Sequence, residues 1–250
     1  MDSKKTLAEL QKISSSLAAE CGALCFGSNV QAVYNPLVYA ARPHRLYLEL
    51  TGAAPKKIMF LGMNPGPWGM AQTGVPFGEV AAVRDWLGIE AEVDKPEKEH
   101  PKRPIEGFAC LRSEVSGRRL WGLFRERFGT PENFFREHFV ANYCPLVFMN
   151  STGANITPDK LPANESAHLF EICDHALAET IKLLKPEWVI GIGGFAKKRI
   201  DLARGKYFCD RHAQPFSTAQ ILHPSPANPR ANAGWDREVI KTLVELGIWK

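Results

Sequence analysis

The chain has 250 residues, enough for one large domain or two small ones, and its hydrophobic content of 45% is normal for a globular protein with a packed core. Its formal net charge is 31 − 27 = +4, a mild lean toward anionic partners that does not by itself indicate nucleic acid. No apolar run approaches the roughly 18 residues that a membrane-spanning helix needs, and the first residues lack the apolar core of a secretory signal. We therefore expect an intracellular protein with no membrane partner.

The six cysteines support the same compartment. Only Cys21 and Cys25 are close, at a spacing that fits one face of a helix, and there is no C-x-x-C pair and no group of ligands at zinc spacing. The sequence therefore predicts reduced thiols and gives no sign of a metal site.

Helices and strands are expected to alternate along the chain. The pattern predicts helices over 4–20, 77–87, 116–128, 164–184, 195–204 and 235–246, with a short segment over 35–39 that stops near Pro43. Strand-like apolar runs cover 57–62, 138–142, 187–191 and 218–222, and residues 89–110 read as a long loop. The alternation predicts an α/β fold with a mainly parallel four-stranded sheet, helices on both faces, and a single domain over residues 1–250.

Each strand-like run ends in a Pro- or Gly-rich turn. Asn64 stands in the turn Gly62-Met-Asn-Pro-Gly-Pro67, Asn142 precedes Tyr143-Cys-Pro145, and His223 opens His223-Pro-Ser-Pro226. Ligands of open α/β sheets bind in the crevice outside the carboxyl ends of the strands. We therefore expect these three side chains to converge on one rim.

Each candidate also has an ordinary structural explanation. Asn64 and Asn142 can cap turns, Phe77 can belong to the core, and His223 can be a core histidine with its hydrogen bonds satisfied. Together, however, they favour a site for a planar base: an amide pairs with a base edge, a phenyl face stacks on a flipped base, and a histidine stabilises a leaving group.

The turn Gly62-Met-Asn-Pro-Gly-Pro67 contains no carboxylate, so strong general-base catalysis is not expected there. This suits glycosidic cleavage of a pyrimidine nucleotide, in which the sugar becomes oxocarbenium-like and the base leaves as an anion.

The Pro-rich loop from His223 to Trp235 is either a rigid surface turn or a wedge that enters duplex DNA. Basic pieces at residues 102–103, 118–119 and 197–199 are candidates to track phosphates. The glycine turn over 191–194 leaves an NAD-type site as an alternative, although a tight strand-to-helix turn explains it better.

A long segment after the first strand resembles a family signature. Residues 62–79, Gly-Met-Asn-Pro-Gly-Pro-Trp-Gly-Met-Ala-Gln-Thr-Gly-Val-Pro-Phe-Gly-Glu, are similar to the first motif of the SMUG family, the single-strand-selective monofunctional uracil-DNA glycosylases. The segment His223-Pro-Ser-Pro226 followed by Asn228-Pro229 resembles the second motif. Similar segments, including Ser113-Glu-Val-Ser-Gly and Asn155-Ile-Thr-Pro, extend the resemblance from about residue 34 to 247.

The resemblance implies a three-layer α/β/α sandwich and a role for each site residue. Asn64 would hold the attacking water and His223 would stabilise the departing uracil anion. Asn142 would read the uracil edge, Phe77 would stack on its face, and the backbone around Met63 and Gly66 would limit what fits at carbon 5. The residues implied to contact DNA are Pro224, Ser225, Pro226, Ala227, Asn228 and Arg230.

The family acts without metal or cofactor, removes uracil and 5-hydroxymethyluracil from DNA, and leaves an abasic site with no lyase step. This implies a monomeric DNA repair enzyme, cytoplasmic at the nucleoid in a bacterium or nuclear in a eukaryote. The chain departs from the family at Ala227, which is commonly arginine, and at Ala233, which is often lysine, while Arg230 adds a charge nearby. Single- or double-stranded DNA, and a module that binds uracil-containing DNA without cleaving it, both stay open.

Overall fold

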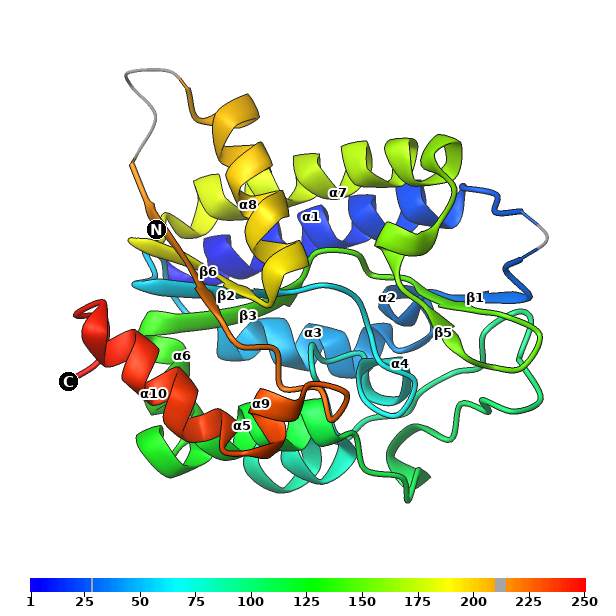
Figure 1. Ribbon diagram of the computed structural model, residues 1–250, viewed down its shortest axis with the longest axis horizontal. Coiled ribbons are helices and arrows are strands. Elements are labelled where there is room, and N and C mark those ends of the chain that lie inside the picture. Colours follow the sequence, from blue (N-terminus) through cyan, green and yellow to red (C-terminus); the bar gives the residue numbers. More distant parts are fainter. Residues whose placement is uncertain (28, 210–214) are drawn as a thin grey trace.

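The computed structural model describes residues 1–27, 29–209 and 215–250, and its main body has three layers (Figure 1). The strands are β1 (Ala32–Tyr34), β2 (Ile58–Gly62), β3 (His138–Asn142), β4 (Val147–Met149), β5 (Asn155–Ile156), β6 (Trp188–Ile192) and β7 (Ser217–Ile221). The helices are α1 (Ser3–Gly22), α2 (Pro36–Tyr39), α3 (Ala41–Leu50), α4 (Met70–Thr73), α5 (Val115–Phe128), α6 (Pro131–Glu137), α7 (Ala163–Leu184), α8 (Gly194–Tyr207), α9 (Pro229–Asn232) and α10 (Trp235–Glu245). Shorter helical turns are η1 (Ala82–Trp86), η2 (Gly107–Ala109) and η3 (Pro158–Lys160).

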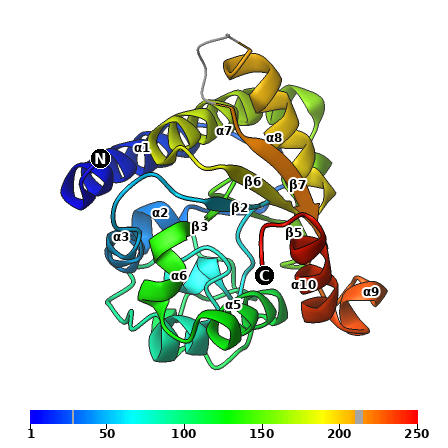
Figure 2. The same cartoon turned by 90° about the vertical axis from the view of Figure 1, so that its left-hand side faces the viewer.

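The middle layer is a parallel sheet with the strand order β3-β2-β6-β7. Strand β2 is buried along its whole length because strands flank both its edges and helices cover both faces. The helices α1, α7 and α8 cover one face, and α3, α5, α6 and α10 cover the other, as the two perpendicular views show (Figures 1 and 2). The predicted α/β/α sandwich with a four-stranded parallel sheet is confirmed.

Strand β2 is also the point where the topology changes direction. The chain passes from β2 to β3 on one side of it and later returns to β6 on the other side. Gly62 at the end of β2 pairs in register with Asn142 at the end of β3. Such a switch point leaves a crevice outside the carboxyl ends of the strands, where ligands of α/β proteins bind.

A second, antiparallel sheet with the order β1-β4-β5 lies beyond the carboxyl end of β3 (Figure 1). Its strands are two or three residues long. They are too short for a periodicity argument, so the sequence did not predict this sheet. It brings the segment after β5 toward the crevice.

Two predicted boundaries are wrong. Helix α3 continues through Pro43, which lies in its first turn, where a helix needs no backbone N–H from that residue. The helix predicted over 77–87 starts only at Val80, because Phe77 has a φ of +53° and lies in a turn. Among the described residues, no helix is both long and apolar enough to cross a membrane.

Candidate active site

A cavity of about 530 Å³ opens at the carboxyl ends of the parallel strands, within the usual size range of small-molecule sites. Asn64 follows β2, Asn142 ends β3 and His223 follows β7. The predicted site residues that line this cavity are Met63, Asn64, Gly66, Phe77, Asn142, His223, Ser225 and Pro226. The structure thus brings together the side chains that the sequence placed on one rim.

The amide of Asn142 is a polar group without an adequate partner. Its Oδ1 is shielded from solvent and has no hydrogen-bond partner among the described residues. Its Nδ2 lies 3.2 Å from the sulfur of Met70, and a thioether is a weak acceptor. A buried polar group left unpaired costs about 1–3 kcal/mol, so a ligand with a donor and an acceptor side by side would relieve this cost.

The ring of Phe77 lies beside this amide because Gly62 has no side chain. A Cβ on Gly62 would stand 2.4 Å from Asn142 Oδ1 and 2.5 Å from Phe77 Cε2. The positive φ of Phe77 is rare for an aromatic residue and is held by its carbonyl oxygen, which accepts from Glu79 N–H at 2.8 Å and packs against Gly117 of α5. The turn therefore fixes an aromatic ring beside the amide of Asn142.

The amide of Asn64 is oriented through its nitrogen. Nδ2 donates to the carbonyl oxygen of Leu146 at 3.2 Å. An amide nitrogen fixed in this way leaves Oδ1 to accept a hydrogen bond in the cavity that Asn64 lines.

His223 presents a neutral ring to the cavity. Its Nδ1 accepts from the backbone N–H of Ser225 at 3.1 Å, so the proton of the neutral ring is on Nε2. Burial lowers the pKa of His223, which favours this neutral form. The ring centroid lies 6.3 Å from that of Phe77. The site therefore offers an N–H donor without a positive charge.

The glycine turn after β6 is explained by packing. Gly193 has a φ of +88°, and a Cβ there would stand 3.2 Å from the Cβ of His223. A Cβ on Gly191 would stand 2.4 Å from the backbone nitrogen of Lys197 in α8. The glycines let α8 and His223 approach β6 closely, which is the structural alternative that the sequence favoured over an NAD-type turn.

Glu114 is a site residue that the sequence analysis missed. It lines the cavity just before α5, and a Cβ on Gly66 would stand 1.9 Å from its Oε2. That oxygen is shielded from solvent and unpartnered among the described residues. Burial raises the pKa of Glu114 to about 7, against the opposing effect of hydrogen bonds from the backbone of Trp68 and Gly69. The family-like segment Ser113-Glu-Val-Ser-Gly was the signal that pointed to it.

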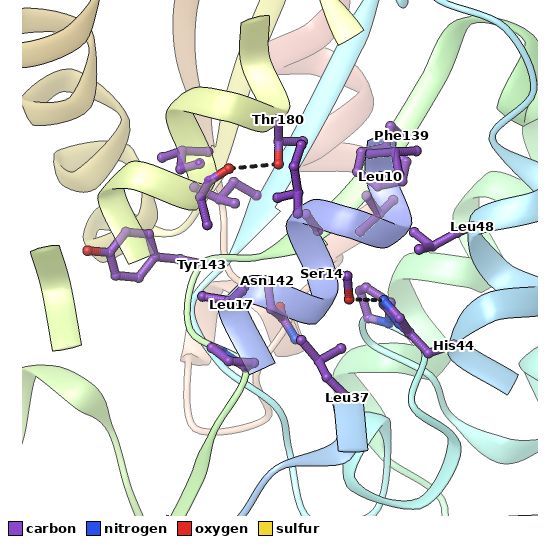
Figure 3. Close-up of a pocket in the computed structure, with 18 of the residues that line it drawn as sticks. Leu10, Ser14, Leu17, Leu37, His44, Leu48, Phe139, Asn142, Tyr143 and Thr180 are labelled. Atoms are coloured by element: carbon purple, nitrogen blue, oxygen red, sulfur yellow. Dashed lines mark hydrogen bonds between the residues drawn. The ribbon is translucent and has the colours of Figure 1, made fainter. Parts of the chain in front are cut away.

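Asn142 also borders a smaller cavity of about 80 Å³ between α1, α3, α7 and β3, shown in Figure 3. Its lining residues are mostly apolar, and its polar side chains other than Asn142 are hydrogen-bonded within the protein. His44 Nε2 accepts from Ser14 at 2.9 Å while His44 Nδ1 donates to the carbonyl oxygen of Gly74 at 2.8 Å. Burial lowers the pKa of His44 to about 4, so this histidine is a neutral core residue. Apart from Asn142, which borders both cavities, the smaller cavity lacks the unpaired polar groups of the larger one.

The loop after β7 is clamped onto α5. Arg119 donates to the carbonyl oxygen of Pro224 and to Asn232 Oδ1, each at 2.9 Å. Asn232 Nδ2 in turn donates to the carbonyl oxygen of Pro226 at 2.9 Å. Pro224 is buried in this arrangement, whereas Pro226 and Ala227 are exposed at the tip. The loop therefore projects from the edge of the cavity and is anchored by hydrogen bonds to α5 and α9.

The remaining residues of the second motif face α9 and α10. Asn228 Oδ1 accepts from the backbone N–H of Arg230 at 3.1 Å and caps α9. The guanidinium of Arg230 pairs with Glu238 at 2.9 Å, and both side chains are exposed. Exposed ion pairs contribute about 0–1 kcal/mol, so this pairing does not fix the arginine.

Two of the predicted phosphate-tracking pieces have other partners. Arg199 forms a buried ion pair with Asp174 that joins α8 to α7, and Lys197 pairs with Asp201 within α8. Arg119 anchors the loop after β7 through Pro224 and Asn232. Among the described residues, no group of three or more His, Cys, Asp or Glu side chains is arranged to hold a metal ion.

Comparison with known proteins identifies the family of the chain and relatives of its fold. The model of the uracil DNA glycosylase superfamily matches residues 51–244. The crystal structure of SMUG2 from Pedobacter heparinus shares the fold, with a TM-score of 0.60 and 15% identity over 94% of this chain and 97% of that one.

Two curated relatives are closer in sequence. The single-strand selective monofunctional uracil-DNA glycosylase of Rattus norvegicus is 48% identical over 232 residues, covering 93% of this chain and 82% of that protein. The Bos taurus protein of the same name is 48% identical over 225 residues, covering 90% and 81%. The chain belongs to the uracil DNA glycosylase superfamily, in its single-strand selective monofunctional family.

Proposed function

We propose that the protein is a uracil-DNA glycosylase that receives a flipped uracil in the 530 Å³ cavity and hydrolyses its N-glycosidic bond. The observation that carries this proposal is the unpartnered amide of Asn142 beside the ring of Phe77. Uracil offers an N3–H donor next to the O4 acceptor, which complements Oδ1 and Nδ2 of Asn142. Cytosine presents the reverse pattern and leaves both groups unpaired.

The chemistry assigns one step to each remaining group. As the C1′–N1 bond breaks, its electron pair goes to the base and the sugar becomes oxocarbenium-like. Nε2–H of His223 donates to the uracil oxygen on which negative charge develops. A water held by Asn64 Oδ1 adds to C1′ and releases its proton to solvent, and the product is an abasic site.

The space next to Gly66 affects which pyrimidine bases the cavity accepts. Gly66 has no side chain, and the carboxyl of Glu114 occupies the space next to it. We propose that the backbone around Met63 and Gly66 limits substituents at carbon 5 and that 5-hydroxymethyluracil is accepted with uracil.

The exposed loop tip at Pro226 and Ala227 is the proposed wedge into DNA, supported at its base by Arg119. Asn228 and Ser225 shape the loop, and Arg230 adds a cation beside it. We propose that the protein acts as a monomer. We also propose that it forms one domain, because one cluster of buried residues includes both Leu10 near its start and Trp249 near its end. Six free cysteines support an intracellular location.

Base release under single-turnover conditions tests the function. Wild-type protein should release free uracil from single-stranded oligonucleotides. Asn64→Ala should lower the rate by about 10²-fold with little change in DNA affinity, because a positioned water is lost. Asn164→Ala, an exposed amide on α7, is the matched control. Tight binding without any uracil release by the wild type would instead identify a silent uracil-binding module.

His223 is tested with a better leaving group. His223→Ala should slow uracil release by roughly 10²–10³-fold, and the loss should be smaller for 5-fluorouracil, whose anion needs less stabilisation. An equal loss on both bases would remove His223 from leaving-group stabilisation.

A further inference from the structure

The most exposed large apolar side chain of the described residues stands near the active-site cavity in the sequence. Leu111 is 97% exposed, compared with 60% for Val38 and 47% for Leu202. It lies between η2 and α5, two residues before Ser113 and three before Glu114, which line the cavity. A leucine that buries nothing in the free protein is placed to bury itself against a partner at this rim.

Arg112, the residue after this leucine, and Arg103 both lie over the ring of Trp68. The guanidinium carbon of Arg112 lies 4.3 Å from the ring centroid of Trp68, and that of Arg103 lies 5.2 Å from it. In the described part of the chain, no carboxylate lies within ion-pair distance of either guanidinium. Trp68 itself lines the cavity. The rim therefore carries two cations without anionic partners, stacked on one ring, next to an exposed apolar side chain.

The segment is held in place by buried contacts. Gln72 Oε1 accepts from the backbone N–H groups of Glu106 and Gly107, at 2.8 and 3.1 Å. Its Nε2 donates to the carbonyl oxygens of Pro67 and Pro104, at 3.0 and 3.1 Å. Gln72 is completely buried, so these bonds tie the rim to the first motif without competition from water. The segment that leads to Leu111 is thus fixed relative to the first motif.

We propose that Leu111, Arg112, Arg103 and Trp68 form a second DNA-binding site, separate from the loop after β7, that grips the strand next to the flipped uracil. Leu111 enters the stack and packs against the neighbouring base, as apolar wedges do in proteins that unstack DNA. Arg112 and Arg103 contact the adjacent phosphates. Leu111 thus adds a second, larger apolar wedge to the one at the loop tip, where Ala227 presents only a methyl group. The inference rests on the proposed uracil-DNA function.

DNA is favoured as the occupant by charge and by continuity with the cavity. The two unpaired guanidiniums complement phosphates, and the site begins where the cavity that holds the base ends. Combining aromatic and cationic groups along a strand is typical of proteins that bind single-stranded nucleic acid.

The wedge is tested with Leu111→Ala, with Leu202→Ala on α8 as a matched exposed leucine. Single-turnover uracil release from a U:A duplex should fall about 10-fold in Leu111→Ala and less than 2-fold from single strands, because only the duplex must be unstacked. The fluorescence of 2-aminopurine placed next to uracil should rise less on binding than with wild type. Leu202→Ala should match wild type throughout. Equal losses on both substrates, or no difference from Leu202→Ala, would overturn the wedge.

The phosphate contact is tested with Arg112→Ala, with Arg204→Ala on α8 as the charge-matched control. The Kd for DNA containing a tetrahydrofuran abasic analogue should rise about 3–10-fold, and the slope of log K against log salt should shrink by about one. This measurement needs no base release, so it stands even if the wild type released no uracil and the proposed function failed. An unchanged Kd and salt slope would exclude Arg112 from the DNA interface.

Discussion

At the scale of single residues, the active site depends on glycines that let neighbouring side chains lie close together and on a polar side chain that has no partner among the described residues. Gly62, which has no side chain, allows Asn142 and Phe77 to lie close together, and Gly66 leaves space that Glu114 fills. The amide of Asn142 has no adequate partner within the described protein. These local arrangements are costly for folding and are explained by a ligand that pairs and stacks there.

Asn142→Asp should weaken uracil excision. An ionised carboxylate accepts hydrogen bonds but cannot donate to uracil O4, so one buried group loses its partner at a cost of about 1–3 kcal/mol. We expect the single-turnover rate on uracil to fall by about 10–10²-fold and cytosine to gain access. Asn164→Asp is the control for the charge change. Full rate and unchanged selectivity for uracil over cytosine in Asn142→Asp would disprove its role in base recognition.

Gly62→Ala should separate activity from stability. The added Cβ would stand within 2.5 Å of Asn142 Oδ1 and Phe77 Cε2, so the edge-reading amide or the stacking ring must shift. We expect uracil release to fall by about 10²-fold or more. Gly205→Ala in α8, where a Cβ meets nothing within 4 Å, should keep full activity and gain about 0.5–1 kcal/mol of stability. The measurements are single-turnover rates and urea unfolding of both variants, and wild-type activity in Gly62→Ala would contradict the packing described here.

Glu114 should make the protein less stable as the pH rises from about 4.5 to 7. Burial raises the pKa of Glu114 to about 7 in the folded protein, from 4.5 when unfolded. In this range the folded state binds more protons than the unfolded state, so this group lowers stability as pH increases and adds no further change above pH 7. Glu114→Gln keeps an acceptor for the backbone and should remove this slope. Thermal unfolding of both proteins at pH 5, 6, 7 and 8 tests it, and parallel Tm curves would refute the raised pKa.

At the scale of elements, the wedge loop and its helix act as one unit. Arg119 on α5 binds the loop at Pro224 and binds α9 through Asn232, which itself returns to Pro226. His223 opens the same loop, and the backbone of Ser225 fixes its ring. The clamp therefore links the loop tip, the proposed DNA contact, to the placement of His223, the proposed catalytic group.

Arg119→Met should release the loop. We expect uracil release to fall about 10-fold, because His223 and the loop tip lose a common support, and we expect Asn232→Ala to cause a similar loss. Since both side chains belong to one network, the double variant should lose less than the sum, with a coupling energy of about 0.5–3 kcal/mol. Arg118→Met, an exposed neighbour that does not reach the loop, is the control. Strict additivity would show that the two residues act separately.

At the scale of the whole molecule, the preference for single or double strands depends on how much protein enters the base stack. Ala227 at the exposed loop tip presents only a methyl group, and Arg230 is directed to Glu238 on α10. Unstacking a base costs a few kcal/mol in a duplex and much less in a single strand. The protein should therefore act best on single strands.

Ala227→Arg should raise activity on duplex DNA selectively. A long cationic side chain fills the vacated stack and contacts phosphates, so we expect several-fold faster release from U:G and U:A duplexes and little change on single strands. All substrates are compared at one salt concentration, because salt alone shifts DNA affinity strongly. No change in Ala227→Arg, together with a large duplex loss in Arg230→Ala, would show that Arg230 already provides this function.

The sequence determined the sheet and most of the rim. Apolar runs bounded by Pro and Gly turns predict strands, and parallel strands place their carboxyl ends on one edge, so Asn64, Asn142 and His223 were expected together before any coordinates. Their convergence needs only local patterns and a general rule of topology. The resemblance to a glycosylase family supplied their roles.

Other features were decided by tertiary structure alone. No local pattern shows that the carboxyl of Glu114 lies against Gly66 or that Gly62 leaves room for Asn142 and Phe77. The same is true of Arg119, which supports the loop after β7. Each of these contacts joins segments that are distant in the chain. The same holds for Arg199, a predicted phosphate contact that pairs with Asp174 inside the protein. Sequence periodicity fixes which face of an element is apolar, whereas contacts between elements depend on packing, which permits a side chain only where its neighbours leave room.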